Sequence, residues 1–171
     1  DAFINFSECL RQLRTHSTAN GPKIYKPAML SVVIDAIEDG ELVANQFEFD
    51  AMESRFRERL QQLGVEPKAE YAVEAFFHLS GDLFWMLCYH DAKQCITDTP
   101  SAKGLRERVR FAKLNETFWR LMQIPVYRRQ AKEVLAEAWW PERQTLLPLK
   151  GVVQSIPAQS TPQQGPDYSL A

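Results

Sequence analysis

The stretch KPAMLSVVIDAIEDG, residues 26–40, constrains the fold more than any other part of the chain. Its large apolar residues recur at three- and four-residue spacing, which predicts a helix with one buried stripe: Leu30, Val33, Ile34 and Ile37. Pro27 suits the first turn of that helix, because its missing N–H would have no helical partner there. Gly40 suits the left-handed position that follows a helix end. The acidic residues expected to face solvent are Asp35, Glu38 and Asp39.

Tyr25 and Lys26 stand where this helix begins. A helix N-terminus carries partial positive charge and free N–H groups, and it therefore attracts anions such as phosphate. The pair is thus a candidate for contact with a phosphate-bearing ligand.

The remaining pattern predicts an α+β fold that is predominantly helical, with a small antiparallel β-hairpin, and its element order is compatible with a winged-helix topology. Residues 74–90 carry two aromatic-rich runs around Ser80-Gly81-Asp82, which is typical of a hairpin. Residues 44–50 alternate like a short strand, and Asp50 is expected to cap the helix that follows. The further helices are expected at 5–16, 51–64, 105–113, 115–123 and 125–140.

Composition places the chain among soluble globular domains. Of its 171 residues, 45% are hydrophobic and 25% charged, and the formal net charge is −2. Residues 1–102 hold 9 Lys/Arg and 16 Asp/Glu, whereas residues 103–143 hold 10 and 5. This asymmetry allows an acidic protein to present one positive face.

The chain shows no apolar run of membrane-spanning length and no signal-peptide pattern. Its three cysteines, Cys9, Cys88 and Cys95, form no C-x-x-C, which favours reduced thiols in a cytoplasm. We expect one domain over residues 1–143, followed by a Pro/Gln/Ser-rich linker or tail over residues 144–171.

Catalytic and metal motifs do not stand out. We find no Gly-rich phosphate loop, no H-E-x-x-H and no G-x-S-x-G. The candidate metal set of His78, Cys88, His90 and Cys95 matches no familiar zinc spacing, so ordinary core and surface roles are expected for these residues. The sequence therefore indicates no enzyme activity, cofactor or metal in this chain.

A basic run occupies residues 103–113. If the run is helical, one face carries four positive charges: Lys103, Arg106, Arg110 and Lys113. Such a face neutralises DNA phosphates with salt-dependent affinity. The same face also suits a solvated surface that pairs with the acidic first half of the chain. Both interpretations stay open at this point.

Four segments taken in order suggest a relationship to a known family. They are residues 26–40, AFFHLSGDLFWML (75–87), LRERVRFAKLNETFWRLMQ (105–123) and AKEVLAEAWWP (131–141). Over about residues 5–141 the series resembles the N-terminal domain of HNH restriction endonucleases. That domain type includes the sulfur-binding domains that recognise phosphorothioated DNA.

The resemblance implies which residues form the site. Tyr25 and Lys26 correspond to a residue pair that lies near the DNA. The family's sulfur pocket uses a Tyr-Pro pair, which corresponds here to Glu74-Ala75, so the proline ring is missing and an acid stands beside the phosphate position. This difference implies another modification, a rebuilt pocket, or a related domain that no longer reads sulfur. The pocket candidates are Tyr71, Ala75, Phe76 and His78; the candidates for further DNA backbone contacts, chosen by charge, are Arg106, Arg108 and Arg110.

We therefore expect a non-catalytic domain that binds double-stranded DNA, phosphorothioated or otherwise modified, in a restriction or antiviral defence setting. A C-terminal nuclease domain or a partner protein would do the cutting. The alternative is a protein–protein interaction module of a larger defence protein, without direct DNA contact. Convergence of Lys26, Arg106 and Arg110 on one exposed face would favour DNA, and pairing of each with an acid would favour the interaction module.

Overall fold

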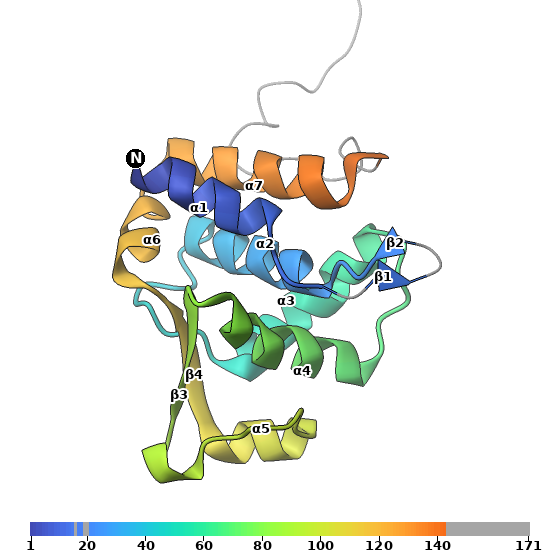
Figure 1. Ribbon diagram of the computed structural model, residues 1–171, viewed down its shortest axis with the longest axis vertical. Helices are drawn as coiled ribbons and strands as arrows, with labels where there is room; N and C mark the ends of the chain where they lie inside the picture. Colours follow the sequence, from blue (N-terminus) through green and yellow to red (C-terminus); the bar gives the residue numbers. More distant parts are fainter. Residues whose placement is uncertain (16, 19–20, 143–171) are drawn as a thin grey trace, which may run out of the picture.

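Helix α2, Tyr25–Glu38, is the centre of the fold. Every residue from Pro27 to Ile37 is buried, because α3, α4 and α7 pack around the helix (Figure 1). A helix that is apolar on all sides requires such an interior position. The predicted helix and its end are confirmed, with Gly40 at a φ of 81°. The predicted single stripe is too narrow, since the helix is covered on every side.

The computed structural model describes residues 1–15, 17–18 and 21–142. The other helices are α1 (Ala2–Arg11), α3 (Phe49–Gln62), α4 (Ala69–His78), α5 (Ala102–Arg108), α6 (Glu116–Leu121) and α7 (Pro125–Trp139). The strands are β1 (Ser17–Thr18), β2 (Gly21–Pro22), β3 (Trp85–Tyr89) and β4 (Val109–Leu114), and two short 3-10 turns are η1 (Leu79–Asp82) and η2 (Ala92–Gln94). The predicted α+β, mainly helical class is confirmed. The tail expected at 144–171 lies outside the described residues.

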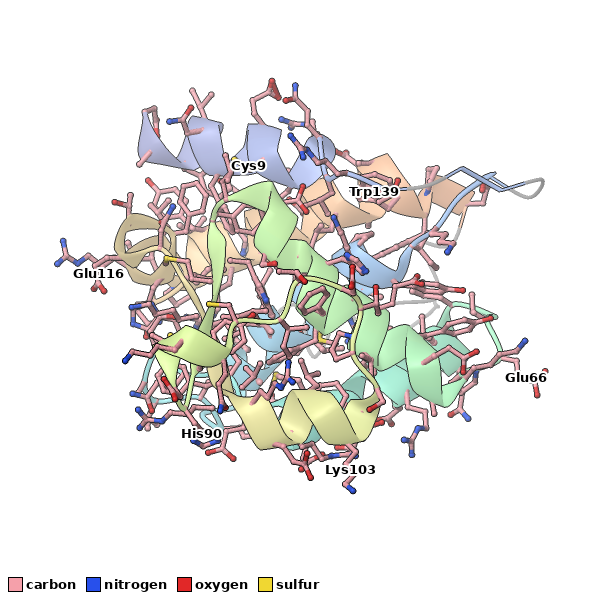
Figure 2. The ribbon with its side chains drawn as sticks, turned by 60° about the horizontal axis from the view of Figure 1, so that its bottom comes forward. Cys9, Glu66, His90, Lys103, Glu116 and Trp139 are labelled. Carbon is pink, nitrogen blue, oxygen red and sulfur yellow. The ribbon has the colours of Figure 1, made fainter. Side chains whose placement is uncertain are left out.

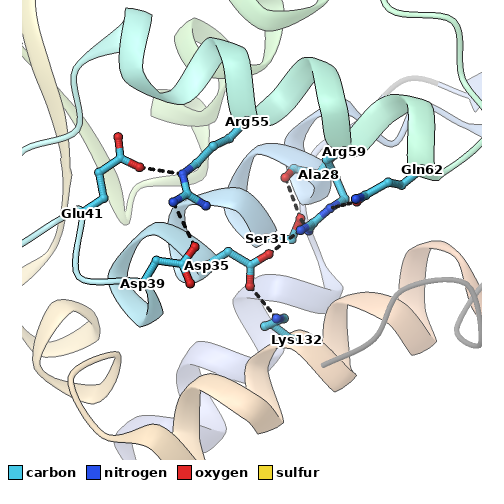
Figure 3. A network of polar contacts seen from close by, with 9 residues as sticks. All are labelled: Ala28, Ser31, Asp35, Asp39, Glu41, Arg55, Arg59, Gln62 and Lys132. Carbon is cyan, nitrogen blue, oxygen red and sulfur yellow. Dashed lines mark hydrogen bonds and ion pairs between the residues drawn. The ribbon is translucent and has the colours of Figure 1, made fainter. Parts of the chain in front are cut away.

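Asp35 corrects the expectation that the acids of α2 face solvent. It is only 1% exposed, and its carboxylate accepts hydrogen bonds from Arg59 of α3 and Lys132 of α7 (Figure 3). Burial by itself would raise the pKa of Asp35, but the two neighbouring cations outweigh burial and lower this pKa below its ordinary value. The polar group thus ties three helices together. Asp39 is exposed, as expected.

The hairpin predicted within residues 74–90 is wrong. Its first half belongs to helix α4, where Ala72, Val73, Phe76 and other residues at helical spacing are buried. Only the second half is a strand, and β3 pairs antiparallel with β4, for example Trp85 with Leu114. In Figure 1 this two-stranded ribbon extends away from the helices toward α5. The adjacent aromatic residues suggested a strand, but the alanines and glutamates around them favour a helix.

The basic segment also divides differently from the prediction. Helix α5 ends at Arg108 and strand β4 begins at Val109, so the expected helix over 105–113 is wrong. Lys103 and Arg106 lie on a helix, whereas Arg110 and Lys113 lie on a strand. The four charges therefore do not share one helix face.

The expected strand over residues 44–50 is reduced to a single antiparallel bridge. The amide of Phe47 donates to the Ala112 carbonyl at 2.7 Å, and the Ala112 amide donates back at 2.9 Å. Helix α3 already begins at Phe49, so Asp50 lies inside its first turn and is not the cap. Phe47 packs against Trp85 with ring centroids 5.4 Å apart, which joins the ribbon to the core.

Within the part of the chain that the structure describes, no helix is both long enough and apolar enough to cross a membrane.

Candidate DNA-binding pocket

A pocket of about 370 Å³ lies where the start of α2 meets the end of α4. Parts of the chain that are distant in the sequence contribute to it, namely residues 14–15 and 23–26 on one side and residues 74–81 on the other. Its lining residues are Arg14, Thr15, Lys23, Tyr25, Lys26, Glu74, Ala75, His78 and Gly81. The pocket combines cations, an aromatic ring and a small apolar residue, which are the groups that hold a phosphate-like anion with an apolar substituent.

Helix α2 places Tyr25 and Lys26 in its first turn, at the pocket. Ile24 is the N-cap and gives no side-chain hydrogen bond to the helix end. The first helical bond runs from the Ala28 amide to the Ile24 carbonyl at 3.0 Å. Pro27 fits this turn because it needs no hydrogen-bond partner for its nitrogen. The first turn of α2 therefore has no side-chain cap, and its residues Tyr25 and Lys26 line the pocket.

Lys26 is held by an ion pair inside the pocket wall. Its Nζ donates to Asp82 Oδ2 at 2.7 Å, and the two side chains are 12% and 6% exposed. The other carboxylate oxygen, Asp82 Oδ1, accepts the Arg14 backbone N–H at 2.9 Å. Asp82 closes the turn η1 after α4. One carboxylate therefore links three segments that surround the pocket.

A second ion pair in the pocket is looser. Lys23 Nζ lies 3.4 Å from Glu74 Oε2, and the side chains are 33% and 35% exposed. Lys23 Nζ also lies 5.8 Å from the centroid of the Tyr25 ring, within cation–π range. Because both groups contact water, this lysine can turn toward an incoming anion at small cost.

Tyr25 stacks on Tyr71 of α4, with ring centroids 4.2 Å apart and planes 21° apart. Burial first, and then the neighbouring Tyr71 hydroxyl, raise the pKa of the Tyr25 hydroxyl, which therefore stays protonated at neutral pH. Lys68 Nζ lies 6.0 Å from the Tyr71 ring centroid, so a further cation lies near the stacked rings of Tyr25 and Tyr71.

His78 is the last residue of α4 and is exposed. Its Nε2 lies 2.7 Å from Thr99 Oγ1, a contact that orients the imidazole beside the pocket. Neighbouring Ala75 is the small apolar residue of the pocket lining, although it is 0% exposed to water.

The structure brings together four of the predicted site residues at this pocket, namely Tyr25, Lys26, Ala75 and His78. Tyr71 stands behind Tyr25 rather than among the lining residues. Phe76 is 0% exposed, and it packs edge-on against Trp85 with ring centroids 5.5 Å apart. We therefore assign Phe76 to the core. The helical period explains this, because Ala75 and His78 face the pocket when Phe76 points inward.

Sequence reasoning missed Arg14, Lys23 and Asp82 at the pocket. The sequence signal for Arg14 and Lys23 is their position, since basic residues at the two edges of a Gly/Pro-containing loop can reach the same ligand. No sequence signal points to Asp82, because the pattern around it predicts a hairpin turn.

The arginines of the basic segment are not among the residues that line the pocket. Arg106 Nε donates to Asp50 Oδ1 at 2.6 Å, and Arg106 also pairs with Glu53 at 3.3 Å. Arg108 and Arg110 are exposed, and the Arg110 guanidinium lies 5.6 Å from the Phe111 ring centroid. Of the three cations proposed to distinguish DNA binding from protein interaction, Lys26 and Arg106 are paired with acids. Charge placement alone therefore does not separate the two functions.

The histidines and cysteines do not form a metal centre in the described part of the chain, where no three His, Cys, Asp or Glu side chains gather closely enough to hold a metal ion. Cys9, Cys88 and Cys95 are free thiols. Burial and the nearby Asp82 carboxylate raise the pKa of Cys9, which keeps this thiol protonated.

Solved structures of DNA-bound domains share this fold. The sulfur-binding domain of ScoMcrA complexed with phosphorothioated DNA matches with a TM-score of 0.65 and 19% identity over 87% of this chain and 92% of that chain. A structure that adds the SRA domain of ScoMcrA matches with a TM-score of 0.68 and 19% identity, over 87% of this chain and 45% of that one. The sulfur-binding domain of SprMcrA complexed with phosphorothioated DNA gives 0.61 and 20%, over 82% and 86%.

No protein-family model and no curated protein matches the sequence. The three structural matches establish that the chain has the fold of sulfur-binding domains over most of its length.

Proposed function

We propose that this chain is a non-catalytic domain that reads phosphorothioated double-stranded DNA. The observation that carries the proposal is the pocket at the meeting of α2 and α4, in a fold shared with domains solved on such DNA. Tyr25, Lys26, Ala75 and His78 are the proposed contact residues, and Lys23 and Arg14 add positive charge beside them.

Sulfur chemistry gives the pocket its rationale. Replacing a non-bridging phosphate oxygen with sulfur keeps the negative charge but creates a larger, softer corner that accepts hydrogen bonds poorly. An apolar surface such as Ala75 with the Tyr25 ring suits that corner, and cations nearby suit the charge. An ordinary phosphate oxygen placed there loses its water without a partner, at a cost of about 1–3 kcal/mol.

Glu74 limits how the pocket works. By the resemblance it takes the place of the tyrosine in the family's Tyr-Pro pair, and it pairs with Lys23 at 3.4 Å. We propose that Lys23 turns to the DNA backbone while Glu74 stays hydrated, because both side chains are about one-third exposed. The exposed Arg108 and Arg110 are proposed as secondary backbone contacts through their charge alone.

The proposal extends to the biological setting. A domain of this type serves restriction of modified DNA in the cytoplasm, with an HNH nuclease in the parent protein or in a partner performing the cleavage. The support for this step is the resemblance of residues 5–141 to domains of HNH restriction endonucleases.

The experiment is a salt titration of binding to two duplexes that are identical except for one Rp phosphorothioate in each strand. Tighter binding to the sulfur duplex with similar salt slopes supports reading of the modification. Equal, steeply salt-dependent binding indicates a general DNA binder, and no binding at low salt overturns the DNA function in favour of a protein partner.

A matched pair of variants tests whether the DNA contacts the pocket. Lys23→Gln removes a pocket cation, and Lys93→Gln removes an exposed cation of η2 outside the pocket. We expect Lys23→Gln to weaken DNA binding and to lower the salt slope by about 1, as one lost phosphate contact requires. Lys93→Gln should change neither quantity; equal losses in both variants would remove the pocket from the proposal.

A further inference from the structure

Asp82 is the group in the pocket region whose placement the proposed contacts do not explain. Its carboxylate holds Lys26 Nζ at 2.7 Å and the Arg14 amide at 2.9 Å. The Asp82 and Lys26 side chains are only 6% and 12% exposed, so little water screens the pair. The main cation at the start of α2 therefore already has an internal anion as its partner.

An incoming phosphate has to share Lys26 with this carboxylate or displace it. Like charges repel strongly where water is scarce, and a shared lysine gives each anion less stabilisation. The pair Lys23–Glu74 behaves differently, because at 3.4 Å and with both side chains about one-third exposed it opens easily. Lys23 is therefore more readily available to bind a phosphate than Lys26.

We propose that Asp82 is an affinity-determining residue that competes internally with the DNA phosphate for Lys26. This inference rests on the proposed DNA-reading function. Because a phosphate and a phosphorothioate carry the same negative charge, the competition lowers the gain that either group obtains from Lys26. The apolar contacts of the pocket then supply a larger share of the binding free energy.

The first test is Asp82→Asn. The amide keeps an oxygen in place for the Arg14 N–H, removes the negative charge and replaces the oxygen that holds Lys26 with an NH2 group. We expect affinity for both duplexes to rise about tenfold, equivalent to ~1.4 kcal/mol. The salt slope should steepen by about 1, because Lys26 gains a phosphate contact. The ratio of affinities for the sulfur and unmodified duplexes should stay the same.

A control variant separates this effect from a general change of charge. Glu66→Gln removes an exposed carboxylate in the connection between α3 and α4, where Figure 2 shows it projecting from the molecule. It should leave the affinities for both duplexes unchanged. In a double variant with Lys26→Gln, the gain from Asp82→Asn should vanish, because the gain depends on the released lysine.

Three results overturn the inference: unchanged or weaker binding of unmodified DNA by Asp82→Asn, a gain that survives in the Lys26→Gln background, or an equal gain from Glu66→Gln. If Asp82→Asn does not fold, as judged by its thermal transition, Asp82→Ser supplies a neutral acceptor for the same measurements.

Failure of the proposed function is recognised separately. If the parent protein binds neither duplex, inorganic phosphate serves as the probe, followed by NMR shifts of the Lys26 and Arg14 amides. Tighter phosphate binding by Asp82→Asn than by the parent upholds the competition for Lys26 even then, and equal binding refutes it.

Discussion

Two ion-pair clusters at opposite ends of helix α2 differ in what surrounds them. Near the C-terminal end, Asp35 is enclosed by Arg59 and Lys132 between three helices (Figure 3). In the first turn, Lys26 is held by Asp82 at the wall of an open pocket. Both carboxylates are almost fully buried, so burial does not distinguish them. The difference lies in access, since only the Lys26 pair can meet an external anion.

Two ion pairs of similar burial therefore differ in how many partners hold the carboxylate. The Asp35 carboxylate has two cationic donors, and Ser31 accepts from Arg59 at 2.6 Å and donates to the Ala28 carbonyl at 2.7 Å. Such a satisfied network keeps one arrangement. The Lys26–Asp82 pair has one cation beside a cavity, and it is therefore able to exchange partners.

The largest expected effect is the loss of stability in Asp35→Ala. Removing the carboxylate takes the shared anion away from Arg59 and Lys132, whose side chains are 13% and 10% exposed, and this costs about 3–5 kcal/mol in the free energy of unfolding. Urea denaturation followed by circular dichroism measures it. Asp35→Asn keeps an acceptor and should lose less; a parent-like urea midpoint for Asp35→Ala would show that the cluster is not structural.

Acid should weaken the same cluster. The folded-state pKa of Asp35 lies below its ordinary value, so its stabilising contribution is present above the unfolded-state pKa and is lost as pH falls through the folded-state pKa. The free energy of unfolding should decline from about pH 4 downward. Urea midpoints measured between about pH 6 and about pH 3 test this. The decline should be shallower in Asp35→Asn, and an identical decline would assign it to other carboxylates.

A surface pair should matter much less. Arg106 is 42% exposed and Asp50 67% exposed, so Arg106→Gln should shift the urea midpoint far less than Asp35→Ala does. In the duplex titration this variant should retain more DNA affinity than Lys23→Gln, because Arg106 is paired with two carboxylates outside the pocket. A greater loss of affinity in Arg106→Gln would move the DNA contact to α5.

The smallest expected effect is a gain of stability beside the pocket. Leu83 follows Asp82 with a φ of 69° and is 86% exposed. Leu83→Gly relieves this left-handed backbone and should raise the free energy of unfolding by about 0.5 kcal/mol. Val43→Gly is the matched control, because Val43 is 88% exposed and has no positive φ. Val43→Gly should slightly lower the free energy of unfolding. A lower free energy of unfolding in both variants would show that the backbone at Leu83 is not strained.

Local sequence signals were sufficient to predict the central helix α2 and the two pocket residues in its first turn, Tyr25 and Lys26. Apolar spacing, Pro27 and Gly40 are local signals, and local signals suffice for an element that carries its own start and end. Resemblance over four segments further indicated Tyr25 and Lys26 as DNA contacts and Tyr71, Ala75, Phe76 and His78 as the recognition pocket. Tyr71 and Phe76 are not among the residues that line the pocket.

The ion-pair partners of Asp35 and Asp82, and the burial of Phe76, became clear only from the way the helices pack. Asp35 looked like a solvent-facing acid because its two cations lie 24 and 97 residues further along the chain, on α3 and α7. The sequence pattern predicted a strand at Phe76, whereas Phe76 lies on helix α4 and packs into the core. Asp82 pairs with Lys26, which lies 56 residues earlier in the chain. Periodicity specifies which side of an element is apolar, but charge pairing depends on which elements pack together, and packing decides that across the whole chain.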